Sequence, residues 1–403
     1  NNTNWLGNTN ECQWFGITCE SNQNSTVTRV TLSQNQASGS IPSEISALTG
    51  ALRIDLYSNS IQGSIPTSIG SLSLLELLDV EENDLSGPIF TTTGVLRLTN
   101  LVALRGSFND FTGTIPTEIG NLNNLEQLWF ADNGRISGSI PSQIGALTSL
   151  ESIFAYANAL NGTIPTQFAG TNQVNLTQIR LYNNALIGSI PSQLVGPLGL
   201  ETLRLDNNQL TGSIPTQIGQ LAFLQDFRVN ENNIFGRIPS EIGNLLALQN
   251  LILNNNFFSG DIPEQAFTTL SSDLRFVDIS NNRFLRGSIP STLFVLPSVR
   301  NIYLSNCSLT GTMPSNYGTA SNLRDLFVDG NNLNGTVPEI QTGQLPQLNE
   351  FLLHRNTFTG SVPASVCQLR NTQGGTLEDL WSDCQGNPPE ILCDFPVCCN
   401  RCF

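Results

Sequence analysis

Aromatic and arginine residues recur at fixed spacing through the middle of this chain. The recurring positions lie four or two residues before a regularly spaced asparagine, and they hold Trp129, Phe154, Tyr156, Arg180, Tyr182, Arg204 and Arg228. Aromatic rings and guanidinium groups supply apolar contacts, cation–π contacts and hydrogen bonds, and they anchor many binding interfaces. The chemistry that this spacing predicts is recognition by contact, on an exposed row of side chains.

A second interpretation of the same residues stays open. Asp206, Asp226 and Glu231 lie close to the arginines in sequence, and arginines that only neutralise such carboxylates imply no ligand. Exposed ion pairs of that kind contribute ~0 to 1 kcal/mol to stability. Columns of this length also hold some aromatic residues by chance, so the sequence does not choose between a contact surface and a solvated one.

Catalytic chemistry finds no support in the sequence. His354 is the single histidine, and no Ser-His-Asp or Cys-His arrangement, glycine-rich phosphate loop or metal-ligand spacing accompanies it. We therefore expect His354 to be an ordinary surface residue, and we expect a protein without enzymatic activity or cofactor.

A group of carboxylates near the beginning of the chain has two interpretations. Its members are Asp55, Asp79, Glu81, Glu82 and Asp84. Calcium prefers several oxygen ligands, but carboxylates on a flat sheet rarely converge on one ion. The pattern favours a solvated acidic face over a metal site.

The elements that position these residues follow from a unit of about 25 residues, present fourteen times. The unit is complete in Leu200, Leu203, Leu205, Asn208, Leu210, Gly212, Ile214 and Pro215. The asparagine position is occupied by Asn35, Asn59, Asn83, Asn109, Asn133, Asn158, Asn184, Asn208, Asn232, Asn256, Asn282, Cys307, Asn331 and Asn356. A period of 24 to 26 residues with this spacing is the leucine-rich-repeat signature.

The physical reason for the pattern lies in how the units stack. Apolar residues three and five before the asparagine share one side of a short strand, and stacking joins them into one core. The asparagine amide is expected to satisfy backbone groups of neighbouring turns. Thirteen units carry a proline after the glycine, whereas the third has Pro88 and Phe90 instead. We expect local irregularity between Gly87 and Gly94.

Composition limits the class of protein. The net charge is −15, with seventeen arginines and no lysine, so binding to nucleic acid or to an anionic membrane surface is disfavoured. No stretch approaches the ~18 to 20 apolar residues of a membrane span. No charged-then-apolar leader opens the chain, so if the protein is secreted, we expect the leader to have been removed.

The cysteines indicate the domain organisation and the compartment. Eight of the nine lie at the ends, and they are Cys12, Cys19, Cys367, Cys384, Cys393, Cys398, Cys399 and Cys402. Disulfide-bonded caps that close both ends of the core would persist only in an oxidising compartment. The sequence thus predicts an N-terminal cap over residues 1–26, fourteen repeats over 27–366 and a C-terminal cap over 367–403.

Pairing can be predicted for only two of these cysteines. We expect a Cys12–Cys19 disulfide, whereas the other six allow 15 connectivities. Zinc is the alternative for the C-terminal group, but adjacent Cys398 and Cys399 without histidine fit a disulfide knot better. Cys307, at an asparagine position, is expected to be a buried free thiol.

Glycan acceptor sequons point to the same compartment. The expected sites are Asn1, Asn24, Asn161, Asn175 and Asn334, and a sixth sequon at Asn306, beside the sheet, is expected to stay unoccupied.

A family resemblance rests on two motifs. The opening Trp5 with Cys12-Gln13-Trp14-Phe15-Gly16-Ile17-Thr18-Cys19, and the Gly-x-Ile-Pro segment of the units, resemble plant-type extracellular leucine-rich-repeat proteins, including receptor ectodomains and polygalacturonase inhibitors. The resemblance implies a right-handed α/β solenoid with a long concave parallel sheet, short second strands and 3₁₀ turns on the outer wall, and disulfide-capped ends. The ending from Cys393 to Phe403 departs from that cap and is similar to microalgal secreted repeat proteins.

We therefore expect a secreted, non-catalytic protein that binds an extracellular protein, peptide or glycan through its concave or lateral face. One alternative is a structural subunit of an extracellular matrix or surface filament, formed by self-association through a contact that does not close. Another is the ectodomain of a membrane receptor. No nucleic acid and no membrane insertion of this chain are expected.

Overall fold

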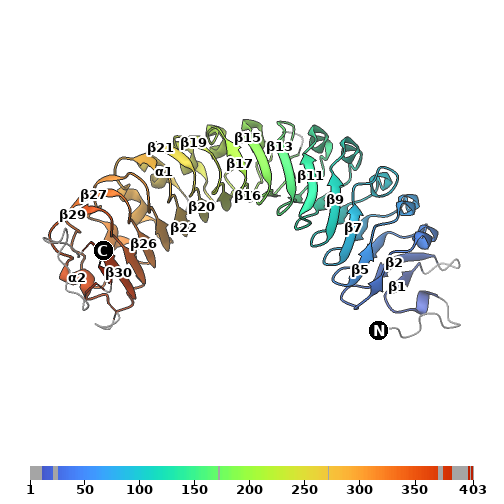
Figure 1. Ribbon diagram of the computed structural model, residues 1–403, viewed down its shortest axis with the longest axis horizontal. Coiled ribbons are helices and arrows are strands. Elements are labelled where there is room, and N and C mark those ends of the chain that lie inside the picture. The colour runs from blue at the N-terminus through green and yellow to red at the C-terminus, as the bar shows by residue number, and fades with distance from the viewer. Residues whose placement is uncertain are drawn as a thin grey trace. The chain divides into compact units, whose positions relative to one another are not determined.

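The computed structural model describes residues 11–20, 26–170, 173–270, 272–370, 375–383, 398–399 and 401–402. The chain divides into two compact units, residues 1–200 and 201–403. Within each unit, every repeat contributes one strand to a parallel sheet on one side, and most add a short strand and a 3₁₀ turn on the other (Figure 1). The predicted repeat solenoid is confirmed.

The first unit begins with an antiparallel pair, after which its sheet is parallel. Its sheet strands are β1 (Ile17–Cys19), β2 (Val27–Thr31), β4 (Arg53–Asp55), β6 (Leu77–Asp79), β8 (Ala103–Arg105), β10 (Gln127–Trp129), β12 (Ser152–Phe154) and β14 (Gln178–Arg180). Its outer strands are β3 (Ser38–Gly39), β5 (Ser60–Gly63), β7 (Asp84–Pro88), β9 (Asp110–Thr114), β11 (Arg135–Ser139), β13 (Ala159–Thr163) and β15 (Ala185–Ser189). Its 3₁₀ turns are η1 (Glu11–Gln13), η2 (Ser43–Ala47), η3 (Thr67–Ser71), η4 (Val95–Arg97), η5 (Thr117–Asn121), η6 (Ser142–Ala146) and η7 (Ser192–Val195).

The second unit repeats this plan. Its sheet strands are β16 (Thr202–Arg204), β18 (Asp226–Arg228), β20 (Asn250–Ile252), β22 (Phe276–Asp278), β24 (Asn301–Tyr303), β26 (Asp325–Phe327), β28 (Glu350–Leu352), β30 (Asp379–Ser382) and β31 (Arg401–Cys402). Its outer strands are β17 (Gln209–Thr211), β19 (Phe235–Gly236), β21 (Phe257–Asp261), β23 (Phe284–Arg286), β25 (Thr310–Thr312), β27 (Asn332–Gly335) and β29 (Thr357–Phe358). Its helical turns are η8 (Thr216–Gln220), η9 (Ser240–Asn244), α1 (Glu264–Thr269), η10 (Ser291–Val295), η11 (Tyr317–Thr319) and α2 (Ala364–Cys367).

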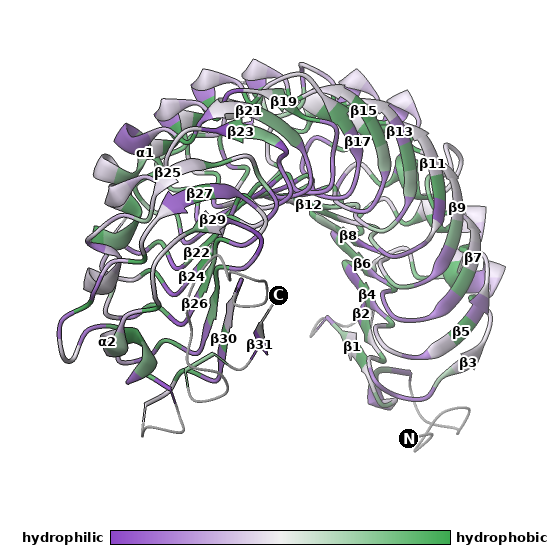
Figure 2. Cartoon of the chain, turned by 60° about the vertical axis from the view of Figure 1, so that its left-hand side comes forward, coloured by the Kyte–Doolittle hydropathy of each residue, from purple (hydrophilic) through white to green (hydrophobic). Residues whose placement is uncertain are grey.

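The core of each unit lies between its two layers. Leu203 and Leu205, five and three residues before Asn208, are completely buried, as are Leu200 and Leu210. Figure 2 shows hydrophobic segments along the strands of both layers and hydrophilic ones in many of the connecting turns. Apolar burial in each repeat is therefore completed by its neighbours.

The repeated asparagine forms the expected hydrogen-bond ladder. Asn232 Nδ2 donates to Leu205 O at 3.0 Å and to Val229 O at 3.1 Å, and Leu210 N donates to Asn232 Oδ1 at 2.9 Å. With a further bond from Nδ2 to Asn230 O at 3.1 Å, one amide pairs four backbone groups of two repeats.

The hydrogen-bond ladder of the repeated asparagine, whose place in each repeat we call the ladder position, is interrupted at two places. Each follows a repeat with one extra residue between the asparagine and the next buried apolar residue. The buried apolar residue normally follows the asparagine by two positions, but Ile136 follows Asn133 by three and Leu285 follows Asn282 by three. At the second of these sites, Leu285 N donates to Asn282 O instead of to the asparagine position of the next repeat. Asn158 Oδ1 is buried without a hydrogen-bond partner, and at the other site Cys307 replaces the amide.

The third repeat is irregular, as predicted. Strand β7 runs through Pro88, and η4 has three residues where most other repeats have five. Phe90 stands where proline is usual, and its ring packs edge-on against Phe130 at a centroid distance of 5.2 Å. Phe90 is thereby buried in the core.

Candidate binding surface

Four side chains on adjacent strands of the first unit form a continuous stack. Arg105, Trp129, Phe154 and Arg180 end β8, β10, β12 and β14, and the strands pair in register at these residues. The rings of Trp129 and Phe154 lie 4.8 Å apart and 12° from parallel. The guanidinium carbon of Arg105 lies 4.5 Å from the Trp129 ring, and that of Arg180 lies 4.5 Å from the Phe154 ring. We name these four residues the aromatic ladder.

A second stacked pair lies two residues further along two of the same repeats. The rings of Tyr156 and Tyr182 are 4.4 Å apart and 5° from parallel. Burial raises the pKa of Tyr156, and the hydroxyl of Tyr182 raises it further. Tyr156 therefore keeps its phenolic proton at neutral pH and can donate as well as accept a hydrogen bond.

Hydrogen bonds hold the side chains of the aromatic ladder in place. Arg105 Nε donates to Gln127 Oε1 at 2.9 Å, and Arg105 Nη1 lies 3.1 Å from Asp79 Oδ2. Trp129 Nε1 donates to Ser152 Oγ at 2.9 Å, and Arg180 Nη2 donates to Gln178 Oε1 at 2.9 Å. Fixed side chains lose less entropy on binding than mobile ones, which favours recognition at such a site.

The stacking geometry restricts the kind of ligand contact. Because the ring faces contact one another or a guanidinium group, the faces are occupied and the ring edges remain for a ligand. Ring edges carry partial positive charge, and together with two guanidinium groups they favour carbonyl and carboxylate oxygens. Neither the ladder nor the tyrosine pair contains a residue type that commonly attacks or transfers an acyl group.

The structure divides the predicted site residues between the two units. Trp129, Phe154, Tyr156, Arg180 and Tyr182 lie together in the first unit.

Arg204 and Arg228 belong to the second unit, where each pairs with a carboxylate. Arg204 Nη2 lies 3.1 Å from Asp206 Oδ2, and Arg228 Nε lies 2.8 Å from Asp226 Oδ1. These two arginines thus form ion pairs of the kind that the second interpretation describes.

Sequence reasoning omitted Arg105 from the site. The signal was available, because Arg105 occupies the same column as Trp129, one repeat earlier. It also omitted Tyr303 and Phe327 of the second unit, whose rings stack at 4.4 Å and 11° from parallel.

The expectation that His354 is an ordinary surface residue is wrong. Its side chain is buried, with Nε2 3.8 Å from Asp329 Oδ2 and its ring 5.5 Å from that of Trp381. Burial lowers the pKa of His354, although Asp329 and Asp383 oppose this shift. The spacing from Asn356 placed His354 on the exposed side of the sheet, but the large side chain of Trp381 on the neighbouring strand lies against it.

The prediction of a solvated acidic face is also partly wrong. Asp55 and Asp79 are only 7% and 4% exposed, and Arg53 and Arg105 pair with them at 2.9 and 3.1 Å. Burial raises the pKa of Asp79 and of Glu81. Within the described residues, no group of three or more acidic, histidine or cysteine side chains could hold a metal ion.

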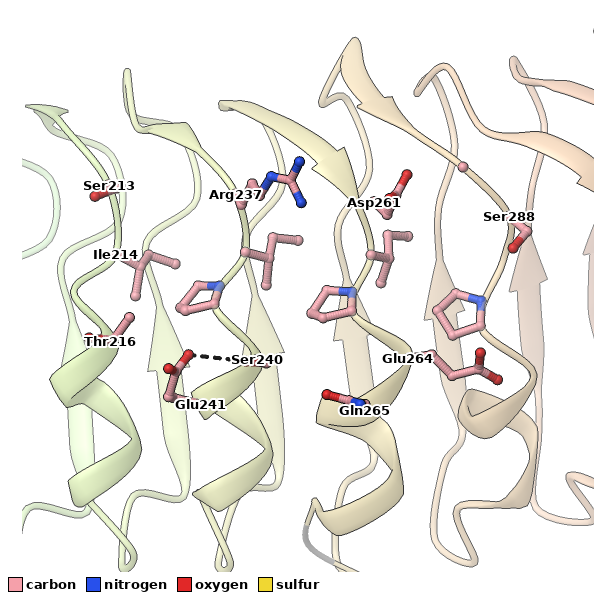
Figure 3. Close-up of a pocket in the computed structure, with 16 residues that line it drawn as sticks. Ser213, Ile214, Thr216, Arg237, Ser240, Glu241, Asp261, Glu264, Gln265 and Ser288 are labelled. Atoms are coloured by element: carbon pink, nitrogen blue, oxygen red, sulfur yellow. Dashed lines mark hydrogen bonds between the residues drawn. The ribbon is translucent and has the colours of Figure 1, made fainter.

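A groove of about 980 Å³ lies on the outer wall of the second unit, across the Gly-x-Ile-Pro segments of successive repeats (Figure 3). Arg237 and Asp261 stand above its row of isoleucines and prolines, and Ser240 Oγ donates to Glu241 Oε2 at 3.3 Å below it. The groove contains none of the predicted site residues.

The cysteines and sequons are placed as follows. Disulfides join Cys12 with Cys19 and Cys367 with Cys398, Cys399 is also disulfide-bonded, and Cys307 is a buried free thiol. Cys384, Cys393, Asn1 and Asn24 lie outside the described residues. The remaining sequon asparagines are exposed, namely Asn161, Asn175, Asn306 and Asn334.

Comparisons with known proteins agree with the repeat fold. The family model "Leucine Rich Repeat" matches residues 199–221, 273–296 and 298–319. No curated protein sequence matches the chain. Among the described residues, no helix is long and apolar enough to cross a membrane.

Solved structures of plant receptors are similar to the chain. A TDR receptor is 31% identical with a TM-score of 0.76, over 84% of this chain and 57% of that one. The ectodomain of the Arabidopsis thaliana membrane receptor kinase GASSHO1/SCHENGEN3, in complex with CASPARIAN STRIP INTEGRITY FACTOR 2, is 31% identical with a TM-score of 0.72, over 86% and 43%. The Arabidopsis receptor kinase HAESA, in complex with the peptide hormone IDA and the co-receptor SERK1, is 27% identical with a TM-score of 0.59, over 93% and 77%. The chain thus spans about half the length of the first two.

Proposed function

Since the chain is a leucine-rich-repeat protein of the plant-type extracellular family, we propose that it is a non-catalytic recognition protein that binds an extracellular peptide or protein. The observation that carries this proposal is the aromatic ladder, a row of part-exposed rings and guanidinium groups held by their own hydrogen bonds. Aromatic residues and arginine are the commonest interface anchors, and Tyr156 and Tyr182 extend the same surface.

Secretion is part of the proposal. Its support is the pair of disulfides, Cys12–Cys19 and Cys367–Cys398, since such bonds persist in oxidising compartments. The exposed sequon asparagines are compatible with glycosylation there. The similarity to receptor ectodomains also favours a second candidate, the extracellular part of a membrane receptor. A membrane span encoded after Phe403 in the transcript would support that candidate, and a stop codon there would refute it.

The recognition proposal is tested by selecting ligands on the protein. Twelve-residue peptides displayed on phage are selected on the native chain, and the affinities of the selected peptides are measured by surface plasmon resonance. Replacing Trp129, Phe154 and Tyr182 together by alanine should preserve folding and weaken binding roughly thirtyfold or more, because one interface anchor contributes about 2 kcal/mol or more.

The matched control removes three other exposed rings. Phe235, Phe257 and Phe284 are 54%, 37% and 44% exposed on outer strands of the second unit, and their replacement by alanine should leave binding within twofold. Peptides that bind the ladder variant as tightly as the native chain would refute the proposal. Loss of folding in the variant of Trp129, Phe154 and Tyr182 would show that these side chains stabilise the fold instead.

A further inference from the structure

A second stretch of sheet face, in residues 301–381, carries charge of the opposite sign. Asp325, Glu350 and Asp379 are the first residues of β26, β28 and β30, and they pair in register across the three strands. We name them the carboxylate row. Adjacent parallel strands lie ~4.8 Å apart, so the three carboxylates follow one another at close spacing on one face.

The carboxylate row destabilises the part of the sheet in which it lies. Like charges directly opposite on neighbouring strands destabilise a sheet. Burial raises the pKa of Glu350, and Asp325 and Asp379 raise it further. Within the described residues, Asp325 and Glu350 form no ion pair, although arginines elsewhere on the sheet faces pair with Asp55, Asp79, Asp206 and Asp226.

Neutral donors hold the outer carboxylates in position. Tyr303 Oη donates to Asp325 Oδ2 at 3.1 Å, and the amide of Asn301 donates to the same oxygen. Trp381 Nε1 donates to Asp379 Oδ1 at 3.4 Å. The two contacts to Asp325 fix the direction of its charge without neutralising it.

An apolar row runs beside the carboxylates. Tyr303, Phe327, Leu352 and Trp381 occupy the position two residues further along β24, β26, β28 and β30, again in register. Each is partly exposed. The guanidinium of Arg401 lies 4.4 Å from the Trp381 ring, so the chain itself already places one cationic group against this row.

The arrangement selects against a metal ion and for an organic cation. No described group of three acidic, histidine or cysteine side chains can hold a metal, because the carboxylates form a line rather than a cage. Arginine and lysine side chains combine a charged end with an aliphatic stem that covers apolar surface. Both parts have a counterpart here.

We propose that the sheet face of β24, β26, β28 and β30 binds a basic peptide segment. Its guanidinium or ammonium groups pair with Asp325, Glu350 and Asp379, and its aliphatic stems lie on Tyr303, Phe327 and Leu352. This surface is distinct from the aromatic ladder and does not depend on it.

The test uses the full chain and a fluorescein-labelled peptide with three arginines separated by glycines, followed by anisotropy. The peptide in which citrulline replaces each arginine has the same shape without charge. We expect the arginine peptide to bind and the citrulline peptide to bind at least tenfold more weakly. Failure of the arginine peptide to bind, or equal binding of the two, would overturn the proposal.

Two variants locate the contact. The triple variant Asp325→Asn, Glu350→Gln, Asp379→Asn should weaken binding at least tenfold. Glu350→Gln alone should weaken it several-fold without lowering the melting temperature, since it removes repulsion. The single variant keeps the test decisive if the triple variant folds poorly.

A control variant removes the same number of negative charges from a different part of the chain. Asp84→Asn, Asp110→Asn and Glu118→Gln neutralise three exposed carboxylates in the first unit and should change affinity less than twofold. An equal loss in this control would show non-specific attraction to an acidic protein and would overturn the proposal, as would displacement of the peptide by micromolar calcium.

Discussion

At the scale of single residues, the ladder asparagines differ in how much of the amide they use. Asn256 accepts a hydrogen bond from Ile234 N at 2.9 Å and donates to Val229 O at 2.9 Å. Asn158 donates to Phe130 O at 2.9 Å, but its Oδ1 has no partner. The extra residue in the preceding repeat removes the N–H that Asn158 would accept, and the same insertion precedes Cys307. Cysteine is therefore tolerated where the N–H of the buried apolar residue donates elsewhere, as Leu285 N does to Asn282 O.

Replacing an asparagine by cysteine measures this difference. We predict that Asn256→Cys lowers the free energy of unfolding by about 1–3 kcal/mol more than Asn158→Cys, because only the first leaves a buried N–H unpaired. Urea denaturation of the two variants checks the prediction, with each serving as control for the other. Equal losses would contradict the role assigned to the inserted residue.

His354 makes stability depend on pH. Its pKa is lowered by burial in the folded chain, whereas the unfolded value is about 6.5. Above about pH 6.5 both states hold it neutral. Below that pH the unfolded chain takes up the proton first, so the free energy of unfolding falls. Asp329 and Asp383, which oppose the shift, set its size.

We predict that the native chain loses more stability between pH 7.5 and pH 5.5 than the variant His354→Gln. Carboxylates with raised pKa, such as Asp79 and Asp278, contribute in the opposite direction, but equally in both proteins. Urea denaturation at the two pH values gives the comparison. Identical pH dependence in the two proteins would rule out the histidine as its source.

At the scale of elements, each repeat turns sharply between its sheet strand and the ladder position. The residue directly before that position has a positive φ in every repeat, between 50° and 65°. Only Gly330 is a glycine, whereas Phe108 and Ala157 adopt the same conformation with a side chain. This left-handed conformation costs about 1–2 kcal/mol for most residues, and the ladder hydrogen bonds hold the chain in it.

Phe108 is the clearest place to relieve this strain, since it is 44% exposed with φ 56°. We predict that Phe108→Asn raises the free energy of unfolding by about 0.5–1 kcal/mol, because asparagine tolerates the left-handed region. Thermal unfolding provides the measurement, and Phe223→Asn, at a 62% exposed site without positive φ, is the control. A loss of stability at Phe108 would show that its ring makes contacts worth more than the strain.

At the scale of the whole molecule, the two caps protect the open ends of the core. Cys12–Cys19 lies beside the antiparallel pair of β1 with β2, in which Ile17 opposes Val30. Cys367–Cys398 ties α2 to the C-terminal segment. Inner repeats are stabilised by the repeats on both sides and need no disulfide.

We predict that reduction opens the chain from its ends. In hydrogen exchange with a reducing agent, amides of β2 and β28 should lose protection before those of β10 and β20. Alkylation of Cys307 under native conditions, without reduction, is the control and should be slow because the thiol is buried and its pKa is raised to about 11. Uniform loss of protection along the chain would contradict this order.

The sequence by itself determined the repeat, the strands and the column that holds Trp129 and Phe154. These features depend on a period and on alternation within one strand, which are local properties repeated fourteen times. It also predicted the irregular third repeat, because Phe90 replaces a proline there.

Only the tertiary structure decided what lies beside each column residue. His354 and Asp79 occupy outward positions yet are buried, because neighbouring repeats cover them. Arg105 joins the aromatic ladder and Arg204 pairs with Asp206, although both stand in the same column. The direction of a side chain follows from the pleat of one strand, whereas its burial depends on the size of residues in neighbouring repeats. Its partner comes from the next repeat, as for Arg105 with Trp129, or from the same repeat, as for Arg204 with Asp206.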